Sequence, residues 1–546
     1  MKNIKSNIYK ASGILLLGML AMFACNDDEE VFEKTRLFRP VLNEKLYAEG
    51  NTIIADIGNL KEAISYTIEV SRDTFKTIDY TFDADTSYVE INETTVGEEL
   101  LWFTIYQVRA TAHAADPQYD SKSSDLGAVR TQKYPSNQGA PNLQFDVTDT
   151  RARVFWSTSG DLIDRVRVYA INDLRLETPL FDIELTQEQI DDNEAIVNNL
   201  TPVTTYQIAI YSGETLRGWE VYTTKPALEF GDRPVYDLSG IESEDILADT
   251  LGDIEDGAVV IVEPGRVYQA NGYAFNSSVL IISGYGFTPA LPLINTSSGN
   301  YDITDGATID SLVFKNVAIH GDFSGGYVFN ISVSGSIGEI KFEGCEIHSH
   351  RGITRIKGGI GTVDKYSIVN SVADSINGYA AFYVDTDGWT AGDVLLENST
   401  FSKFQYFLAS RTNTGSITIE SCTIDQAPEA GRQMFRWRGG DGKNNVTGGI
   451  KIHNTIWGPG WDMSGAEVYS VKGVEGLGST TFDIINTWSP SDFSFSGNDI
   501  AGFPSFIYSG TADDLWVDRE NMDYNIKDKG FSAANSAGDP RWRSGL

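Results

Sequence analysis

Basic side chains recur in the C-terminal half of the chain at a spacing that could bind anions. The region 351–451 holds 11 basic and 10 acidic residues, whereas 231–350 holds 4 basic and 17 acidic ones. Successive side chains of a strand point to opposite faces, so residues of one parity share a face. Arginine recognises carboxylates through paired hydrogen bonds, so such a face is predicted to bind a linear polyanion. The residues predicted to share the outward parity and contact the ligand are Arg355, Lys357, Tyr383, Asp385, Arg411, Arg436, Arg438 and Lys472.

The same residues allow a second interpretation, a solvated face that binds nothing. Like charges on neighbouring strands repel one another. Asp385 could offset this repulsion by pairing with Lys357 and Arg411. Residues of the opposite parity, such as Phe382 and Phe435, suit the interior of the domain.

These segments belong to an internal repeat, in which a strand-like motif ends in a turn residue followed by a small residue. Such repeats are typical of solenoids, in which each repeat forms one coil. A motif at 281–284 is expected to begin the series, and the asparagines are interpreted as a ladder whose side-chain amides bond along the stack. The turn residues are Asn316, Gly344, Asn370, Asn398, Ser421, Asn454 and Asn486, spaced by 28, 26, 28, 23, 33 and 32 residues.

Two cysteines follow turn residues in this register. Three coils separate Cys345 from Cys422, which corresponds to about 14 Å at ~4.8 Å per strand. A disulfide needs Cα atoms within about 7 Å of each other. We therefore expect these cysteines not to be bonded to one another.

Residues 137–226 show strand periodicity with a recognisable motif. Trp156 lies in an early strand, and Leu200 and Pro202 form a Leu-x-Pro motif before Tyr206, which opens a late strand. This pattern resembles a fibronectin type III module, in which such a tyrosine forms a corner. Residues 36–132 look like a weaker copy, and the resemblance implies that both modules are spacers.

The repeat within 231–546 resembles the right-handed parallel β-helix of pectate lyases and polygalacturonases. The predicted fold class is therefore all-β, with two fibronectin type III-like β-sandwiches followed by a right-handed parallel β-helix, a pectate-lyase-like solenoid. Architecture by itself does not determine function.

The resemblance also implies an enzymatic alternative, a Ca²⁺-dependent polysaccharide lyase acting on uronate polymers. Asp385 and Asp387 would then hold the metal, and Arg411 or Arg436 would be the base. The motifs of classical pectate lyases are missing, and the only polygalacturonase motif is Arg-Ile-Lys at 355–357. His348 and His350 lack the glycine frame of that family and are interpreted as loop residues. The binding function requires no cofactor.

The N-terminus predicts secretion. Three lysines precede an apolar run over 11–24, which is too short to span a membrane comfortably. The run ends in Met22-Phe23-Ala24-Cys25, which resembles a bacterial lipobox and implies a signal peptide over 1–24 and lipidation of Cys25. An acidic tether is expected over 25–35, and its residues Asn26-Asp27-Asp28-Glu29-Glu30 resemble the surface-export signal of Bacteroidota lipoproteins. An ordinary cleaved signal peptide is the alternative.

The composition excludes several classes of function. The chain has 42 basic and 76 acidic residues and a formal net charge of −34, which disfavours nucleic acid as a partner. Three cysteines exclude a disulfide framework and a cysteine zinc site.

Taken together, the sequence predicts a surface lipoprotein of the outer membrane in a polysaccharide-utilisation system. It would bind an acidic polysaccharide such as pectin or polygalacturonate and pass it to a TonB-dependent transporter complex. The alternatives are the lyase and a structural or adhesive surface protein.

Overall fold

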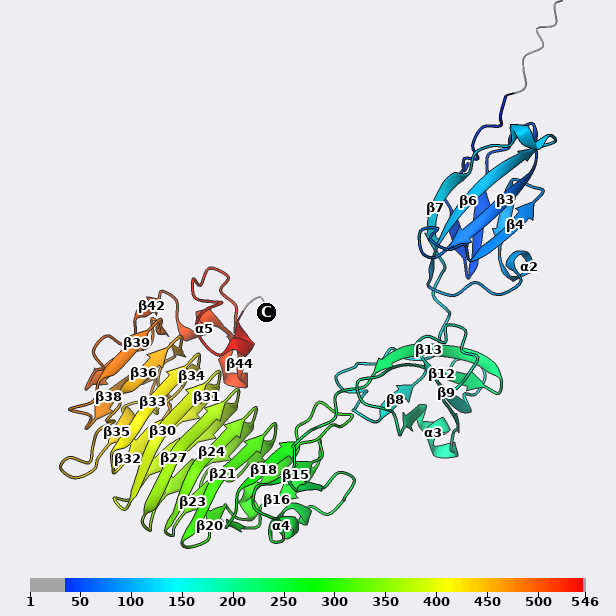
Figure 1. The fold of residues 1–546 in the computed structure, drawn as a ribbon. Coiled ribbons are helices and arrows are strands. Elements are labelled where there is room, and N and C mark those ends of the chain that lie inside the picture. Colours follow the sequence, from blue (N-terminus) through cyan, green and yellow to red (C-terminus); the bar gives the residue numbers. More distant parts are fainter. Residues whose placement is uncertain (1–34, 544–546) are drawn as a thin grey trace, which may run out of the picture. The chain divides into compact units, whose positions relative to one another are not determined.

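The computed structural model describes residues 35–543 of the chain. The predictions for the N-terminus stay untested, because residues 1–34 lie outside the described residues. They include the signal peptide over 1–24, Cys25 and all but the last residue of the tether 25–35. Within 35–543 the protein is all-β, with two sandwiches followed by a parallel solenoid (Figure 1), as the sequence predicts. No helix in this range is long and apolar enough to cross a membrane.

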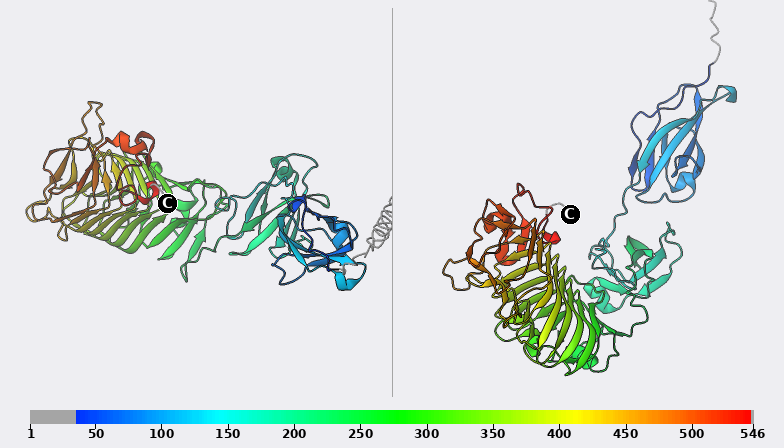
Figure 2. Two further views of the ribbon diagram at one scale, coloured as in Figure 1. Left: turned by 90° about the horizontal axis from the view of Figure 1, so that it is seen from above. Right: turned by 60° about the vertical axis from the view of Figure 1, so that its left-hand side comes forward.

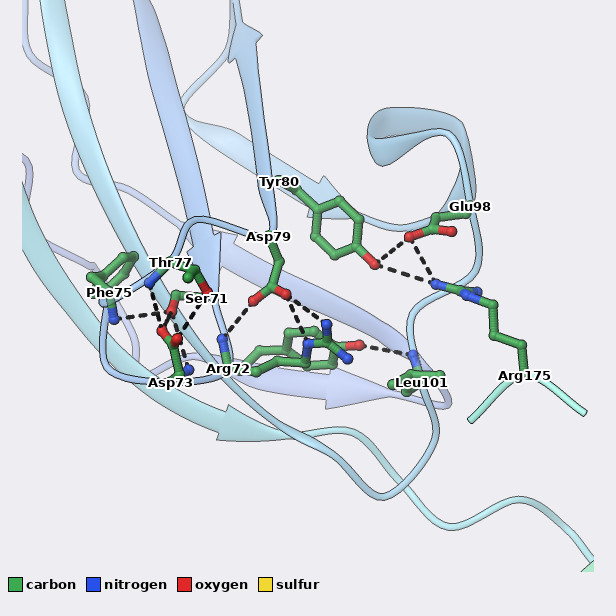
Figure 3. Close-up of polar contacts among 11 residues, drawn as sticks. Ser71, Arg72, Asp73, Phe75, Thr77, Asp79, Tyr80, Glu98, Leu101 and Arg175 are labelled. Carbon is green, nitrogen blue, oxygen red and sulfur yellow. Dashed lines mark hydrogen bonds and ion pairs between the residues drawn. The ribbon is translucent and has the colours of Figure 1, made fainter. Parts of the chain in front are cut away.

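The first sandwich has a three-stranded sheet, in the order β1–β2–β5, and a four-stranded sheet, β4–β3–β6–β7. Its Tyr106 forms the corner expected of this fold, because the Leu101 amide donates to its hydroxyl at 2.9 Å (Figure 3). The turn after β3 is held by Asp73, which accepts bonds from Ser71 and Thr77. The elements are β1 Tyr47–Glu49, β2 Thr52–Asp56, β3 Ala63–Ser71, β4 Tyr80–Ala84, β5 Tyr88–Ile91, α2 Glu93–Val96, β6 Ile105–Ala114, the 3-10 turn η1 Pro117–Tyr119 and β7 Ser124–Arg130.

The second sandwich repeats this plan with a sheet β11–β8 and a sheet β10–β9–β12–β13. The Tyr206 hydroxyl accepts a bond from the Thr201 amide at 3.0 Å, so the predicted tyrosine corner is confirmed. Trp156 is buried, as expected for an early core strand. The elements are β8 Ala152–Phe155, β9 Arg165–Ala170, β10 Phe181–Glu184, α3 Gln187–Asp192, β11 Glu194–Val197, β12 Thr205–Ser212 and β13 Thr215–Thr223.

The solenoid consists of three parallel sheets, which we number in the order that each coil contributes to them. Strands of consecutive coils run side by side in both sets of views (Figures 1 and 2). Sheet 1 contains β14 Val235–Asp237, β15 Ala258–Val262, β18 Val279–Ser283, β21 Ala307–Lys315, β24 Gly335–Glu343, β27 Gly361–Val369, β30 Trp389–Glu397, β33 Thr414–Glu420, β36 Ile450–His453 and β39 Phe482–Ile485.

Sheet 2 contains β16 Val267–Gln269, β19 Leu293–Asn295, β22 Ala318–His320, β25 Glu346–His350, β28 Val372–Ile376, β31 Thr400–Phe404, β34 Thr423–Asp425, β37 Ile456–Trp457, β40 Trp488–Pro490 and β42 Phe506–Tyr508. Sheet 3 contains β23 Tyr327–Ile331, β26 Gly352–Ile356, β29 Phe382–Val384, β32 Leu408–Ser410, β35 Gln433–Trp437, β38 Val471–Glu475 and β41 Phe495–Gly497. A short pair, β17 Ala274–Phe275 and β20 Asp302–Ile303, lies in the early coils, and α4 is Ile246–Leu251.

The solenoid begins earlier than the repeat at 281–284 suggests, because β14 already pairs with β15, and β15 pairs with β18, in sheet 1. These first coils have no asparagine or other recognisable turn residue in the marker register, so the repeat pattern misses them. The interior is largely apolar, with Phe314 stacked on Phe342 at 5.5 Å between ring centroids. Burial of this continuous core stabilises the coils.

Each turn residue between sheets 1 and 2 has a left-handed backbone. The φ angles run from 48° at Asn398 to 65° at Gly344. Asparagine and glycine adopt this conformation more readily than other residues, which explains their recurrence. The expected amide-to-amide bond joins Asn486 to Asn454 at 2.8 Å, whereas Asn454 itself donates to Glu420.

The small residues after the turn residues form a buried row. The amide of Cys345 donates to the Ser371 hydroxyl, and the amide of Ser371 donates to Ser399. Cys345 and Cys422 are both buried and free, which confirms that they are not bonded to one another.

A C-terminal segment folds back over the outer side of sheet 2. Its buried apolar residues, including Leu515 and Trp516, form a core of their own together with Ile456 of β37. In Figure 1 this segment lies beside β31 and β34, and it buries polar residues such as Ser402 and Asp425. Its elements are α5 Ala512–Leu515, β43 Trp516–Asp518, β44 Asp523–Ile526 and the 3-10 turns η3 Arg519–Asn521 and η4 Pro540–Trp542; a further 3-10 turn, η2 Thr296–Ser298, lies in the early coils.

Candidate functional site

The outward residues of sheet 3 form two rows along the solenoid. In the first row, strand pairing places six residues in register: Asn330, Arg355, Tyr383, Ala409, Arg436 and Glu475. The second row lies two residues further along each strand and contains Lys357, Asp385, Arg411 and Arg438, whose amides continue the backbone ladder at 2.7–2.9 Å. We call these two rows the arginine face. It brings together most of the residues that the sequence places on one side.

The centre of the arginine face is the carboxylate of Asp385. Arg355 and Arg411 each donate to it at 2.7 Å, and Arg438 lies 3.7 Å from it. The sequence interpretation paired Asp385 with Lys357 and Arg411, so only the Arg411 partner is seen. Three guanidinium groups around one carboxylate leave a net positive charge at this point.

The ion pairs shift the protonation equilibria of this cluster. Burial alone raises the pKa of Asp385, but hydrogen bonds from Arg355 and Arg411 outweigh it, and the pKa lies below its ordinary value. The hydrogen bond to Asp385 raises the pKa of Arg411. Asp385 is therefore ionised, and Arg411 stays charged, throughout the neutral range.

Tyr383 faces outward from its strand but is only 2% exposed, which the sequence did not anticipate. It belongs to an outer aromatic cluster with Tyr406 and half-buried Tyr379. Guanidinium groups cover these rings: Arg355 lies 4.0 Å from the Tyr379 ring centroid, and Arg436 lies 4.8 Å from that of Tyr406. Cation–π contact and planar stacking both favour this arrangement.

Two arginines of this cluster were missed by the sequence analysis. Arg351 lies over Tyr379 at 4.7 Å, and Arg432 lies over Tyr406 at 5.1 Å. Each precedes an arginine of the first row by four residues. That recurring spacing, together with the tyrosines on neighbouring coils, is the signal that could have revealed them.

Lys472 does not lie in the rows of the arginine face, although the sequence predicts it to share their outward parity. It pairs with Gln433, and Glu475 stands beside Arg436 instead, at 2.9 Å from its guanidinium. The predicted position is wrong because a long connection joins β37 to β38. The spacing of the repeats does not show where this connection ends and β38 begins. Lys472 therefore lies at the entry of β38, away from Arg438.

The metal interpretation of Asp385 and Asp387 receives no support from their geometry. Both carboxylate oxygens of Asp385 accept bonds from arginines. The Asp387 side chain is 80% exposed and lies 3.8 Å from Lys443. Within 35–543 no group of three or more histidine, cysteine, aspartate or glutamate side chains is arranged to hold a metal ion.

The structure also bears on the two candidate bases of the lyase alternative. The raised pKa of Arg411 keeps its guanidinium protonated at neutral pH, so the neutral form that could accept a proton is scarcely populated. Arg436 is ion-paired with Glu475. Neither arginine shows the environment that a general base needs at neutral pH.

The prediction that His348 and His350 are loop residues is wrong, because both lie in β25 of sheet 2. His348 stacks edge to face on His320 of the preceding coil, with ring centroids 5.2 Å apart. His350 points inward, and burial lowers its pKa to about 3. Its Nε2 lies 2.8 Å from the Thr296 hydroxyl. Ser349, between the two histidines, has a left-handed backbone with a φ of 59°.

Comparison with known proteins adds little to this picture. No protein-family model and no curated protein matches the chain. Among solved structures, the chain is similar to the FN1–FN3 domains of chicken CNTN1, with 13% identity, covering 35% of this chain and 68% of that one at a TM-score of 0.16. A likeness at this TM-score decides nothing about the site.

Proposed function

We propose that the protein binds an acidic polysaccharide, of the polyuronate type found in pectin, on the arginine face. The observation that carries the proposal is the convergence of Arg355, Arg411 and Arg438 on the single carboxylate of Asp385. A guanidinium has five N–H donors, so each arginine keeps donors for a ligand after bonding Asp385. The Arg411 side chain is 44% exposed and the Arg438 side chain 31% exposed, which leaves both open to a polymer.

A repeating polyanion suits this face better than a neutral glycan. Neighbouring coils are about 4.8 Å apart, so Arg411 and Arg438 present cations on successive steps. The tyrosine rings of the face are covered by guanidinium groups, which leaves little open ring surface there for an uncharged sugar.

The test is isothermal titration of polygalacturonate against wild type and the Arg411→Ala/Arg438→Ala variant. Each charge-assisted hydrogen bond contributes about 1.5–3 kcal/mol, so losing two should weaken binding by about 100-fold or more. Binding should also weaken as salt is added. The matched control is Lys365→Ala/Lys451→Ala, which removes two partly or fully exposed cations from sheet 1.

Equal affinity of a folded Arg411→Ala/Arg438→Ala variant and wild type would refute the proposal. Two further readouts separate the rival functions. Accumulation of unsaturated uronate products, followed by absorbance, would favour the lyase. Failure of wild type to bind any acidic polysaccharide would favour a structural or adhesive role.

The proposal includes display at the cell surface, with Cys25 as the lipid-anchored N-terminus and delivery of glycan to a TonB-dependent transporter complex. It is supported by the lipobox-like ending of the apolar run and the acidic residues after it. Cys25→Ala should release the protein from membranes, as measured by fractionation and protease shaving of intact cells. Continued membrane attachment of this variant would contradict lipidation.

A further inference from the structure

Two aromatic side chains at the edge of the arginine face are not explained by the proposed binding of carboxylates. Phe323 lies in the connection from β22 to β23, and Trp461 lies in the connection from β37 to β38. Their ring centroids are 6.1 Å apart and meet edge to face. Both side chains are partly exposed.

The two rings come from coils five steps apart, so each connection must reach along the solenoid to meet the other. The carbonyl of Phe323 accepts a bond from the Asn377 side chain, two coils further on. Trp461 reaches back one coil, where its amide donates to Pro428 at 3.0 Å and its carbonyl accepts from Ala430 at 2.9 Å. The rings therefore meet near the intermediate coil, which carries Tyr406.

Backbone bonds hold Trp461 in place although it is not in the core. Besides the two backbone bonds of Trp461, the amide of Gly460 donates to the carbonyl of Tyr469 at 2.7 Å, across the base of the connection. The structure thus holds a partly exposed tryptophan rigidly beside the arginine face. A rigid aromatic ring is well suited to pack against a sugar, because little conformational entropy is lost on binding.

A charged side chain is connected to Trp461 through Glu429. Arg432 donates to the Tyr406 hydroxyl at 2.7 Å and to Glu429 at 3.1 Å, and its side chain is 43% exposed. The backbone of Glu429 forms an isolated parallel β-bridge with that of Trp461. A ring that packs on Trp461 would therefore have a guanidinium beside it.

We infer that Phe323 and Trp461 form a subsite for one ring of an acidic polysaccharide, with its carboxylate directed to Arg432. This inference rests on the proposed function and extends it, since it makes the ligand a chain that contacts the arginine face and the aromatic pair together. The occupant is an acidic sugar ring because Arg432, which Glu429 links to Trp461, shares the ring of Tyr406 with Arg436 of the arginine face.

The experiment is titration of polygalacturonate against Trp461→Ala, with Tyr469→Ala as the matched control. Tyr469 belongs to the same connection and is 43% exposed. Loss of the aromatic contact should weaken binding by about five- to tenfold, whereas Tyr469→Ala should bind as wild type does. Phe323→Ala should weaken binding in the same direction.

Two further variants distinguish ring stacking from simple packing. Trp461→Phe keeps an aromatic ring and should bind nearly as wild type does, whereas Trp461→Leu keeps apolar bulk and should bind as weakly as Trp461→Ala. Circular dichroism melts verify that each variant is folded. Wild-type affinity in Trp461→Leu would overturn the stacking role.

The failures of the two proposals are separable. If Arg411→Ala/Arg438→Ala loses binding while the Trp461 and Phe323 variants keep it, the arginine face stands and the aromatic subsite is refuted. The rings would then serve to pack their connections together or to contact another protein. If the double arginine variant binds as wild type does, the proposed function fails first.

Discussion

Asp385 is an acidic residue at the centre of the arginine face. It holds three guanidinium groups around one carboxylate. If charge alone governs binding, Asp385→Ala should bind polygalacturonate more tightly, because the face gains positive charge. We expect the opposite, binding about tenfold weaker, since the arginines lose the contact that orients them. Isothermal titration at low and moderate salt measures the effect.

Asp385→Asn is the matched control, because the amide keeps the shape and one acceptor oxygen and should fall between wild type and alanine. Tighter binding by Asp385→Ala would show that the arginines act only as point charges. The pKa of Asp385 is lowered in the folded protein. Its ion pairs therefore stabilise the fold above about pH 4, the ordinary carboxyl value, and are lost as the pH falls through the lower folded-state pKa.

The turn between sheets 1 and 2 depends on backbone conformation more than on side-chain bonding. Asn398 has a φ of 48°. The equivalent residue two coils earlier is Gly344, with a φ of 65°. Alanine in this conformation costs about 1–2 kcal/mol. Asn398→Ala should therefore destabilise the solenoid by about that amount, whereas Asn398→Gly should change its stability little. Thermal and denaturant melts of the solenoid transition compare the two.

Asn454→Gly provides the contrast, because this substitution also removes the 2.8 Å bond with Asn486 and the bond to Glu420. It should destabilise more than Asn398→Gly does. Equal destabilisation by Asn398→Gly and Asn398→Ala would instead assign the stability of this corner to an amide ladder.

The C-terminal segment ties the end of the chain to coils formed about a hundred residues earlier. Arg519 donates to both oxygens of Asp425 at 2.8 Å, and Asp425 is fully buried. Arg519→Ala leaves this carboxylate without its charge partner and should reduce the stability of the solenoid by about 3–5 kcal/mol. Denaturant unfolding followed by circular dichroism measures the loss.

The double variant Asp425→Ala/Arg519→Ala should lose less stability than the two single variants combined, because no unpaired buried charge remains. An additive result would mean that the pair is not coupled. The segment would then stabilise sheet 2 chiefly through its apolar core around Trp516.

The sequence by itself determined the elements of this protein wherever the signal is local. The turn residues mark the coils from Asn316 onward because a left-handed corner recurs there once per repeat, as at Asn370 and Asn454. The tyrosine corner at Tyr206 follows from a motif of a few residues, in which Leu200 and Pro202 precede the tyrosine. The separation of Cys345 from Cys422 follows from counting coils. Period and turn chemistry act over neighbouring residues, so a single sequence is enough to read them.

The tertiary structure alone decided which side chains meet. It buried Tyr383 under guanidinium groups, placed Glu475 beside Arg436 instead of Lys472, and brought Trp461 to Phe323. Alternation assigns a residue to a face, but it does not show what covers that face or how a long connection enters its strand. These outcomes depend on the rotamers of long side chains and on contacts across many coils. The sequence therefore predicted the face on which the arginines gather, and the packing between coils decided which of them remain exposed.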